Sequence, residues 1–325
     1  MTRVVAPSRL HFGLLHVPAD PAAPGRHFGG CGLMIDGPGV AVRVEPAADW
    51  RGEGPSAARA VEFARRVTTT PHHVTVERCP PEHVGLGVGT SLGLAVAKAL
   101  RPELSATELA PLIGRGERSG VGLYGFEHGG FIVDGGKAAG STLPELVGRH
   151  EFPADWRVAL IIPDQPCRWS GKKEQAVFAR TRVLEEVARS AERMRHLLSD
   201  ELLPALTARD FPRFSEAVYE YNRAAGLPFT ADQGGVYAGE VVTNLVEAVR
   251  ELGVVGVGQS SWGPAVFAVT PDVDRAEYLT DVIWGRFAGL TSAEVVSASP
   301  RGAVVESGPN RSRHSADHDA DQPDE

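Results

Sequence analysis

A glycine-rich loop that leads into an apolar helix is the part of this sequence best suited to bind a ligand. The segment Pro81-Glu-His-Val-Gly-Leu-Gly-Val-Gly-Thr-Ser91 precedes an alanine-rich stretch that ends at Leu100. Alternate glycines let backbone N–H groups approach a ligand closely, and a helix start adds unpaired donors and the positive end of the helix dipole. The pattern predicts a phosphate or pyrophosphate site. Its candidate residues are Gly85, Leu86, Gly87, Val88, Gly89, Thr90 and Ser91.

Two common phosphate-binding loops do not match this segment. A Walker loop ends in Gly-Lys-Ser/Thr, and the first lysine after the glycines is Lys98. The dinucleotide pattern Gly-x-Gly-x-x-Gly fails in both registers, because Thr90 and Leu92 stand where the third glycine is required. The alternative interpretation of the loop, taken alone, is structural, with glycines that serve only the close packing of helix on sheet.

Composition limits the classes of protein to which the chain can belong. Its 325 residues suffice for two domains, and 42% hydrophobic with 23% charged residues is typical of a soluble globular protein. A net charge of −8 argues against nucleic-acid binding. Cys31, Cys79 and Cys167 are far apart, which favours reduced thiols and a cytoplasmic protein. We expect no signal peptide, no membrane span and, from the histidine spacing, no zinc site.

The elements expected around the loop suggest two α+β domains. In the first, strands are expected at 4–6, 40–45, 73–77 and 131–134, with helices at 56–67, 88–100 and from Ala106. In the second, a strand at 156–162, helices at 171–203, 211–225 and up to 252, strands at 254–257 and 265–270, a helix at 272–287 and a strand at 294–299 follow a split βαβ order. We therefore expect domains at 1–153 and 154–306, the second ferredoxin-like, and a disordered acidic tail at 307–325.

Three motifs in this order resemble the kinase superfamily named for galactokinase, homoserine kinase, mevalonate kinase and phosphomevalonate kinase (GHMP). They are Ala6-Pro-Ser-Arg-Leu-His11, the loop Pro81-x-x-x-Gly-Leu-Gly87, and Gly256-Val-Gly-Gln-Ser-Ser-Trp-Gly-Pro-Ala-Val266. The resemblance implies a two-domain α+β fold, with a ribosomal-protein-S5-like N-terminal domain and a ferredoxin-like C-terminal domain. It also implies that the phosphate loop lies between the domains and that the third motif faces it.

The departures from the kinase pattern concern the chemistry itself. Val88 and Gly89 stand where many of these kinases carry two serines, and the hydroxyl groups move on to Thr90 and Ser91. Gly122 stands where the kinases often carry a catalytic aspartate, in Ser119-Gly-Val-Gly122. A kinase of this type needs a carboxylate to orient the hydroxyl group that it phosphorylates, and glycine cannot supply one.

Four further segments resemble one branch of the superfamily, the β-ribofuranosylaminobenzene 5'-phosphate synthases. They are Arg9-Leu-His-Phe-Gly-Leu14, Gly25-Arg-x-Phe-Gly-Gly30, Arg118-Ser-Gly-x-Gly122 and Phe126-Glu-x-Gly-Gly-Phe-Ile-Val-Asp-Gly-Gly136. This resemblance implies a condensation of phosphoribosyl diphosphate with 4-hydroxybenzoate or 4-aminobenzoate that releases pyrophosphate and CO₂ without ATP. It also implies Mg²⁺ as the cofactor and a homodimer.

The resemblance, read with the chemistry of each residue type, gives a candidate site. Arginine forks suit phosphate and carboxylate groups, so the candidate catalytic residues are Arg26 and Arg118, with His11 as an acid–base group. Glu127 and Asp134 are weak candidates for the metal ligands. The candidate substrate-binding residues are Ser8, Arg9, Ser119, Gly120, Ser170, Lys172, Gly258 and Ser260. An ATP-dependent kinase with a displaced base and a non-catalytic sugar-phosphate binder are the alternatives.

Overall fold

The first sheet of the protein carries both the N-terminal strand and the strand that precedes the glycine loop. The computed structural model describes residues 1–15, 26–166, 174, 176–178 and 185–308. The order of the first sheet is β13-β1-β3-β5-β4, and β6 pairs with β3 and β8. The strands are β1 (Thr2–Leu14), β3 (Gly30–Pro46), β4 (Arg51–Glu53), β5 (His72–Arg78), β6 (Phe131–Asp134), β8 (Leu146–His150) and β13 (Val304–Ser307). A separate pair joins β2 (Arg26–His27) to β7 (Lys137–Ala138).

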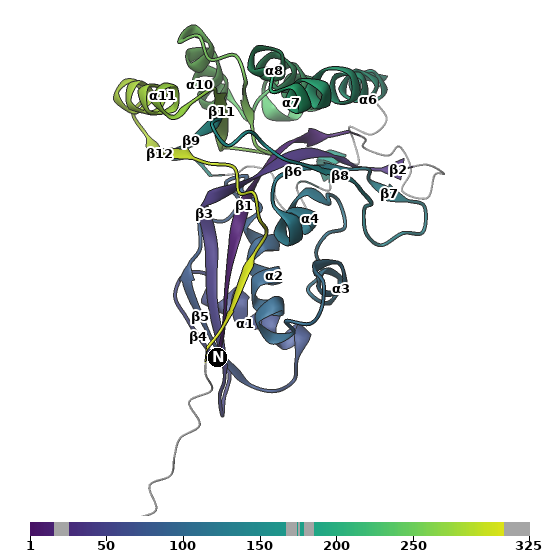
Figure 1. Cartoon of the computed structure of the whole chain (residues 1–325), viewed down its shortest axis with the longest axis vertical. Coiled ribbons are helices and arrows are strands. Elements are labelled where there is room, and N and C mark those ends of the chain that lie inside the picture. The colour runs from purple at the N-terminus through teal and green to yellow at the C-terminus, as the bar shows by residue number, and fades with distance from the viewer. Residues whose placement is uncertain (16–25, 167–173, 175, 179–184, 309–325) are drawn as a thin grey trace, which may run out of the picture.

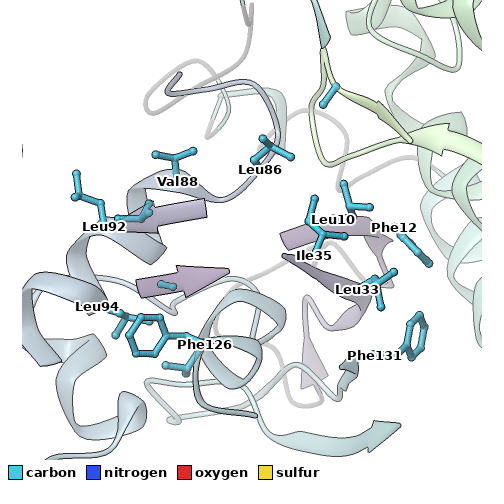
Figure 2. Packing of buried hydrophobic residues seen from close by; sticks show 14 of the residues in the cluster. Leu10, Phe12, Leu33, Ile35, Leu86, Val88, Leu92, Leu94, Phe126 and Phe131 are labelled. Atoms are coloured by element: carbon cyan, nitrogen blue, oxygen red, sulfur yellow. The ribbon is translucent and has the colours of Figure 1, made fainter. Parts of the chain in front are cut away.

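Four helices lie beside this sheet in Figure 1. They are α1 (Ala57–Val67), α2 (Val88–Leu100), α3 (Ala106–Leu112) and α4 (Val121–His128). Helix α2 packs on β1 and β3, and small residues let it come close to its neighbours. A Cβ on Gly93 would lie 2.8 Å from Ile113 Cδ1. Figure 2 shows how Leu86, Val88 and Leu92, which surround the start of α2, pack in the same core as Leu10 and Ile35 of the sheet.

The second sheet has the ferredoxin-like strand order expected from the sequence. Its order is β10-β11-β9-β12, and every pair is antiparallel. The strands are β9 (Arg157–Pro163), β10 (Val257–Gln259), β11 (Val266–Thr270) and β12 (Leu290–Val296). The helices are α6 (Glu185–His196), the π-helical η1 (Leu197–Leu202), α7 (Leu203–Ala208), α8 (Phe211–Gly226), the 3-10 turn η2 (Leu227–Phe229), α9 (Thr230–Gln233), α10 (Glu240–Glu251) and α11 (Val273–Arg286). The two sheets and their helices form the predicted α+β architecture.

One apolar core joins the two sheets, so the site between them rests on a rigid base. Phe12 of β1 stacks on Phe267 of β11 with ring centroids 4.6 Å apart and also contacts Phe131 of β6. Helix α8 contacts both β1 and β10. Burial of large aromatic side chains is among the strongest contributions to a core.

The first and last strands differ from the expectation. The strand expected to end at Pro7 continues to Leu14, because a β-bulge between Ala6 and Ser8 accommodates the proline. The last strand, β13, returns from the second sheet to pair with β1. Ser307 is therefore the last residue of an ordered strand, whereas the tail was expected to begin there, and residues 309–325 lie outside the described part.

Two helices also differ from their expected form. Part of the helix expected at 171–203 lies outside the described residues, and the part from Glu185 onward includes the π-helical turn η1. Ser56 precedes α1 as expected, but its hydroxyl group donates to Glu82 instead of capping the helix. None of the described helices combines the length and hydropathy needed to span a membrane.

Candidate active site

The glycine loop lies against the third glycine-rich motif, as the resemblance implies. The Oγ of Ser260 donates to the carbonyl of Gly85 (2.8 Å), and the amide of Ala265 donates to the carbonyl of Val84 (3.0 Å). Gly85 has a φ of 96°, and a Cβ there would lie 2.4 Å from the carbonyl oxygen of Ser260. This close approach requires glycine at that position. These contacts hold the glycine loop against the turn between β10 and β11 of the second sheet.

Helix α2 begins at the loop and has an arginine side chain across its first turn. Gly87 is the residue before the helix, with a φ of 72°, and a Cβ on it would lie 2.7 Å from Cγ of Arg9. Arg9 Nη1 donates to the carbonyl of Gly85 (3.0 Å). Because the first amides of a helix have no partner within the helix, the N-terminal turn of α2 offers donors beside this guanidinium. The glycine loop, the helix start and Arg9 thus lie together, as the predicted phosphate site requires.

A cleft of about 480 Å³ opens at this helix start, and four arginines line it. They are Arg9 of β1, Arg59 of α1, and Arg115 and Arg118 of the loop between α3 and α4. A Cβ on Gly89 would lie 2.9 Å from a guanidinium nitrogen of Arg59 and 3.4 Å from one of Arg115. Four guanidinium groups around one helix start favour a ligand with several negative charges.

Two of these arginines pair with carboxylates. Arg59 forms an ion pair with Glu82, which also accepts a hydrogen bond from Ser56 (3.0 Å). Arg118 forms an ion pair with Glu174, and its guanidinium lies 5.9 Å from the ring centroid of Phe178. Carboxylate pairing holds both side chains in place at the wall of the cleft.

The other two arginines, Arg9 and Arg115, are partly buried and form no ion pair among the described residues. Burial lowers the pKa of Arg9 to about 10, so the guanidinium is still charged at neutral pH. Burial, followed by the nearby charge of Arg59, lowers the pKa of Arg115. The buried Nε of Arg115 has no hydrogen-bond partner among the described residues. Only the more distant charges of Glu174 and Glu82 act on Arg9 and Arg115, so a bound anion would lower the cost of holding both cations at the cleft.

His11 and Ser119 connect the cleft to a buried aspartate. Nε2 of His11 lies 2.9 Å from Oγ of Ser119, which also interacts with Asp134. Asp134 accepts from the amides of Gly120 (2.5 Å) and Gly136 (2.7 Å), and burial raises the pKa of its carboxyl group to about 6. Burial, aided by the charge of Arg9, lowers the pKa of His11 well below its ordinary value. His11 is therefore a neutral hydrogen-bonding group at neutral pH.

A second, smaller cavity of about 50 Å³ adjoins the cleft. His11, Leu14, Ser261 and Trp262 line both spaces. Five aromatic residues contribute to the walls of the smaller cavity: Phe12, Phe178, Phe229, Tyr237 and Trp262. A charged cleft therefore opens beside an aromatic cavity.

The structure brings most of the predicted phosphate-site residues together. The cleft is lined by the predicted residues Arg9, His11, Gly85, Gly87, Val88, Gly89, Thr90, Arg118 and Ser119. Ser260 supports it from behind, since its Oγ accepts from the amide of His11 (3.0 Å) and donates to Gly85. Leu86 and Ser91 are buried behind the loop and position it.

Other predicted residues have structural roles or lie elsewhere. Ser8 donates to the carbonyl of Pro38 (2.5 Å), and Gly258 packs against Asn222, where a Cβ would lie 2.4 Å from the side chain. Gly120 precedes α4 and is held by Asp134. Arg26 is half exposed, pairs with Glu145 on the β2–β7 ribbon and does not line the cleft. Ser170 and Lys172 lie outside the described residues.

The two candidate metal ligands are used for backbone contacts. Glu127 accepts from the amide of Ala106 (2.6 Å) at the start of α3, and Asp134 binds the amides that precede α4 and follow β6. Neither residue lines the cleft. Within the described residues there is no cluster of three or more metal-ligating side chains.

Several residues of the cleft carry no clear signal in the sequence. Arg59 lies on α1, far from any glycine motif, and only the tertiary fold brings it to Gly89. Glu174 and Trp262 are likewise brought together by the fold, with Trp262 Nε1 donating to Glu174 (2.9 Å). Arg115 was detectable, because Gly114-Arg-Gly-Glu-Arg-Ser-Gly120 alternates glycine with charge in the same way as a ligand-binding loop.

Comparison with families and solved structures agrees with this architecture. Residues 202–282 match the family described as GHMP kinases C terminal. The fold resembles homoserine kinase from Cytophaga hutchinsonii with a TM-score of 0.64 and 14% identity, over 94% of this chain and 97% of that one. At this identity the likeness concerns the fold alone.

Two curated relatives are more similar in sequence. The chain is 31% identical to beta-ribofuranosylphenol 5'-phosphate synthase of Methanothermobacter thermautotrophicus, over 82% of this chain and 88% of that protein. It is 30% identical to the protein of the same name from Archaeoglobus fulgidus, over 83% and 88% of the two chains.

Proposed function

We propose that this chain, which belongs to the family of β-ribofuranosylphenol 5'-phosphate synthases, joins the ribose C1 of phosphoribosyl diphosphate to the ring of 4-hydroxybenzoate or 4-aminobenzoate. The family membership confirms the resemblance found in the sequence. The observation that carries the proposal is the cleft itself: four arginines surround a helix start, and the position of the kinase base is occupied by glycine.

The reaction balances without a proton donor or a second cofactor. The C1–O bond to the diphosphate breaks as C1 forms a bond to the ring carbon that carries the carboxylate. That carboxylate then leaves as CO₂, and the electron pair of the broken C–C bond returns to the ring. Electron donation from the para oxygen or nitrogen makes the ring carbon nucleophilic. The protein must therefore stabilise the negative charge that develops on the diphosphate as the C1–O bond breaks.

Arg9, Arg115 and the first turn of α2 are suited to hold the departing diphosphate. Arg9 and Arg115 lack a carboxylate partner among the described residues, so their charges are available to an anion. Preorganised donors of this kind stabilise the transition state without reorganisation, and one such interaction is typically worth about 2.7–4 kcal/mol. Neutral His11 is suited to accept or donate a hydrogen bond near the reacting carbon, with Ser119 fixing its ring.

The absence of a carboxylate at Gly122 supports a reaction other than phosphoryl transfer. Gly122 lines the cleft, and a Cβ there would lie 3.6 Å from Thr90 and 3.9 Å from Arg9. A base at this position would therefore face the phosphate site, and the chain has none there. A diphosphate that departs intact needs no such base.

The donor set of the cleft also fits Mg²⁺ bound mainly through the diphosphate. The carboxylate of Glu117 and the hydroxyl group of Thr90 line the cleft, and Mg²⁺ commonly takes one or two such oxygens together with substrate phosphates and water. Glu117 and Thr90 would hold the ion, in place of the Glu127 and Asp134 considered from the sequence. When bound, Mg²⁺ neutralises charge on the leaving diphosphate.

The experiment is a product assay on the purified protein with phosphoribosyl diphosphate, MgCl₂ and each benzoate. We expect pyrophosphate and CO₂ in equal amounts with 4-hydroxybenzoate or 4-aminobenzoate and without ATP. Benzoate, which lacks the para donor, should yield neither product. A requirement for ATP with accumulation of ADP would overturn the proposal in favour of a kinase.

A further inference from the structure

A chain of amide hydrogen bonds fixes the polarity of the smaller cavity. The backbone amide of Ala238 donates to Oε1 of Gln259 (2.7 Å), so this end of the Gln259 amide is its oxygen. The Nε2 of Gln259 must then donate, and it does so to Ser261 O (2.9 Å) and to Oε1 of Gln233 (3.2 Å). The backbone donor thus determines the orientation of both side-chain amides.

Gln233 is left with its amide nitrogen as a free donor. The side chain lines the smaller cavity and is only 3% exposed. Its oxygen is used by Gln259, and its nitrogen donates to none of the residues that the structure describes. Because the side chain lines the cavity, this donor is available to an acceptor that binds there.

The walls of the cavity suit a flat aromatic ring. The rings of Phe229 and Trp262 lie 4.8 Å apart at 65°, and those of Phe178 and Trp262 lie 5.6 Å apart. Trp262 is held through its Nε1 by Glu174, which also pairs with Arg118 of the cleft. Tilted aromatic contacts of this kind favour a further ring placed among them.

We propose that the smaller cavity takes the para end of the aromatic acid and that the para oxygen accepts a hydrogen bond from Gln233. This inference rests on the proposed function. The cavity, at about 50 Å³, holds one end of the ring, while the carboxylate end lies at the mouth that it shares with the cleft near His11 and Ser261. The ring carbon that reacts then faces the ribose. The reverse orientation would place a carboxylate among aromatic side chains and the reacting carbon away from the sugar.

The polarity of the cavity selects between the two benzoates. A phenol oxygen accepts a hydrogen bond readily, whereas the nitrogen of an arylamine shares its lone pair with the ring and accepts poorly. The free donor of Gln233 therefore favours 4-hydroxybenzoate over 4-aminobenzoate. As the ring attacks C1, the para oxygen gives electron density to the ring, so the contact with Gln233 serves to bind and orient the acid and does not drive the step.

Calorimetric titration of the purified protein with benzoate, 4-hydroxybenzoate and 4-aminobenzoate tests this subsite. One neutral hydrogen bond typically corresponds to about three- to tenfold in affinity. We expect wild type to bind 4-hydroxybenzoate tighter than the other two acids by about that factor, and Gln233→Met to bind all three about equally. Gln165→Met, the same change outside both cavities, should keep the wild-type ratio.

Three results would overturn the subsite: no binding of 4-hydroxybenzoate, an unchanged ratio in Gln233→Met, or equal affinities for the hydroxy and amino acids in wild type. The wild-type series alone decides the last case, even where the variant does not fold. Pyrophosphate release by wild type is measured in parallel. If wild type releases pyrophosphate but Gln233→Met keeps the wild-type ratio of affinities, the proposed function stands and the subsite is wrong. If wild type binds 4-hydroxybenzoate selectively but releases no pyrophosphate, the subsite stands and the proposed function is wrong.

Discussion

Replacing Arg115 by methionine should have little effect on the stability of the ligand-free protein and a large effect on its affinity for pyrophosphate. Arg115 has an unpartnered Nε, lies close to Arg59, and stacks over Phe63 with its guanidinium 5.5 Å from the ring centroid. Methionine keeps the apolar contact with Phe63 and removes the charge. Without ligand, the variant should therefore melt within about 2 °C of wild type, because the lost charge has no partner and like charges surround it.

The effect on anion binding should have the opposite sign. A hydrogen bond to a charged group contributes about 1.5–3 kcal/mol, so loss of about 2 kcal/mol raises the Kd for pyrophosphate roughly 30-fold. At a ligand concentration of about 100 times the wild-type Kd, wild type gains about 2.7 kcal/mol of stability, and the variant gains about 0.9 kcal/mol. With about 2 °C per kcal/mol for a chain of this size, the melting shifts are about 5 °C and about 2 °C.

Thermal melting with and without pyrophosphate and MgCl₂, together with calorimetric titration, measures both effects. Arg195→Met is the matched control, since Arg195 is exposed on α6 and outside the cleft. It should keep the full shift. A variant of Arg115 that melts many degrees lower without ligand, yet keeps the wild-type shift with pyrophosphate, would refute the assignment and make Arg115 a structural residue.

Two further changes test the glycine at the kinase-base position and the buried aspartate. Gly122→Ala should fold and retain activity, because its Cβ makes only ordinary contacts. Gly122→Asp should lower pyrophosphate release at least tenfold, because the new carboxylate pairs with Arg9. Equal activity of the two variants would contradict this. Asp134 has its pKa raised by burial from 3.8 to about 6, so the folded state binds more protons between these values and stability falls as the pH rises through them. Relative to Asp134→Asn, wild type should lose about 2.4 kcal/mol of unfolding free energy between pH 4 and pH 7 in urea titrations, and a constant difference would refute the shift.

The fold and the loop were predictable because their signals are local. Alternating apolar residues, the glycine run of 85–89 and the split βαβ order each carry a signal in the local sequence. The structure has a strand, a helix start and a ferredoxin-like sheet at those places. The long β1 was missed for the same reason. Pro7 locally indicates a strand end, and the strand continues because the pairing with β3 shifts register there, from Ala6–Val40 to Ser8–Ile35.

The charged residues of the site were less predictable, because a functional arginine is recognised by what surrounds it in space. Arg26 stands in a glycine-rich segment as Arg118 does, yet it pairs with Glu145 at an exposed ribbon. Arg59 stands in an ordinary amphipathic helix, yet it reaches the start of α2. What distinguishes the cleft is its charge balance. Its four arginines outnumber the two carboxylates that pair with them, and the unpaired Arg9 and Arg115 are partly buried.

That surplus explains how a kinase-like fold can serve a reaction without phosphoryl transfer. A kinase site must hold a phosphate and also orient an acceptor hydroxyl group, so it needs both cations and a base. Here Gly122 removes the base, while the helix start and the unpaired charges of Arg9 and Arg115 remain. Such a site binds a diphosphate strongly and gives no help in transferring it. The stabilisation then applies to the bond that joins the diphosphate to its sugar, so the favoured chemistry is departure of the whole group from C1.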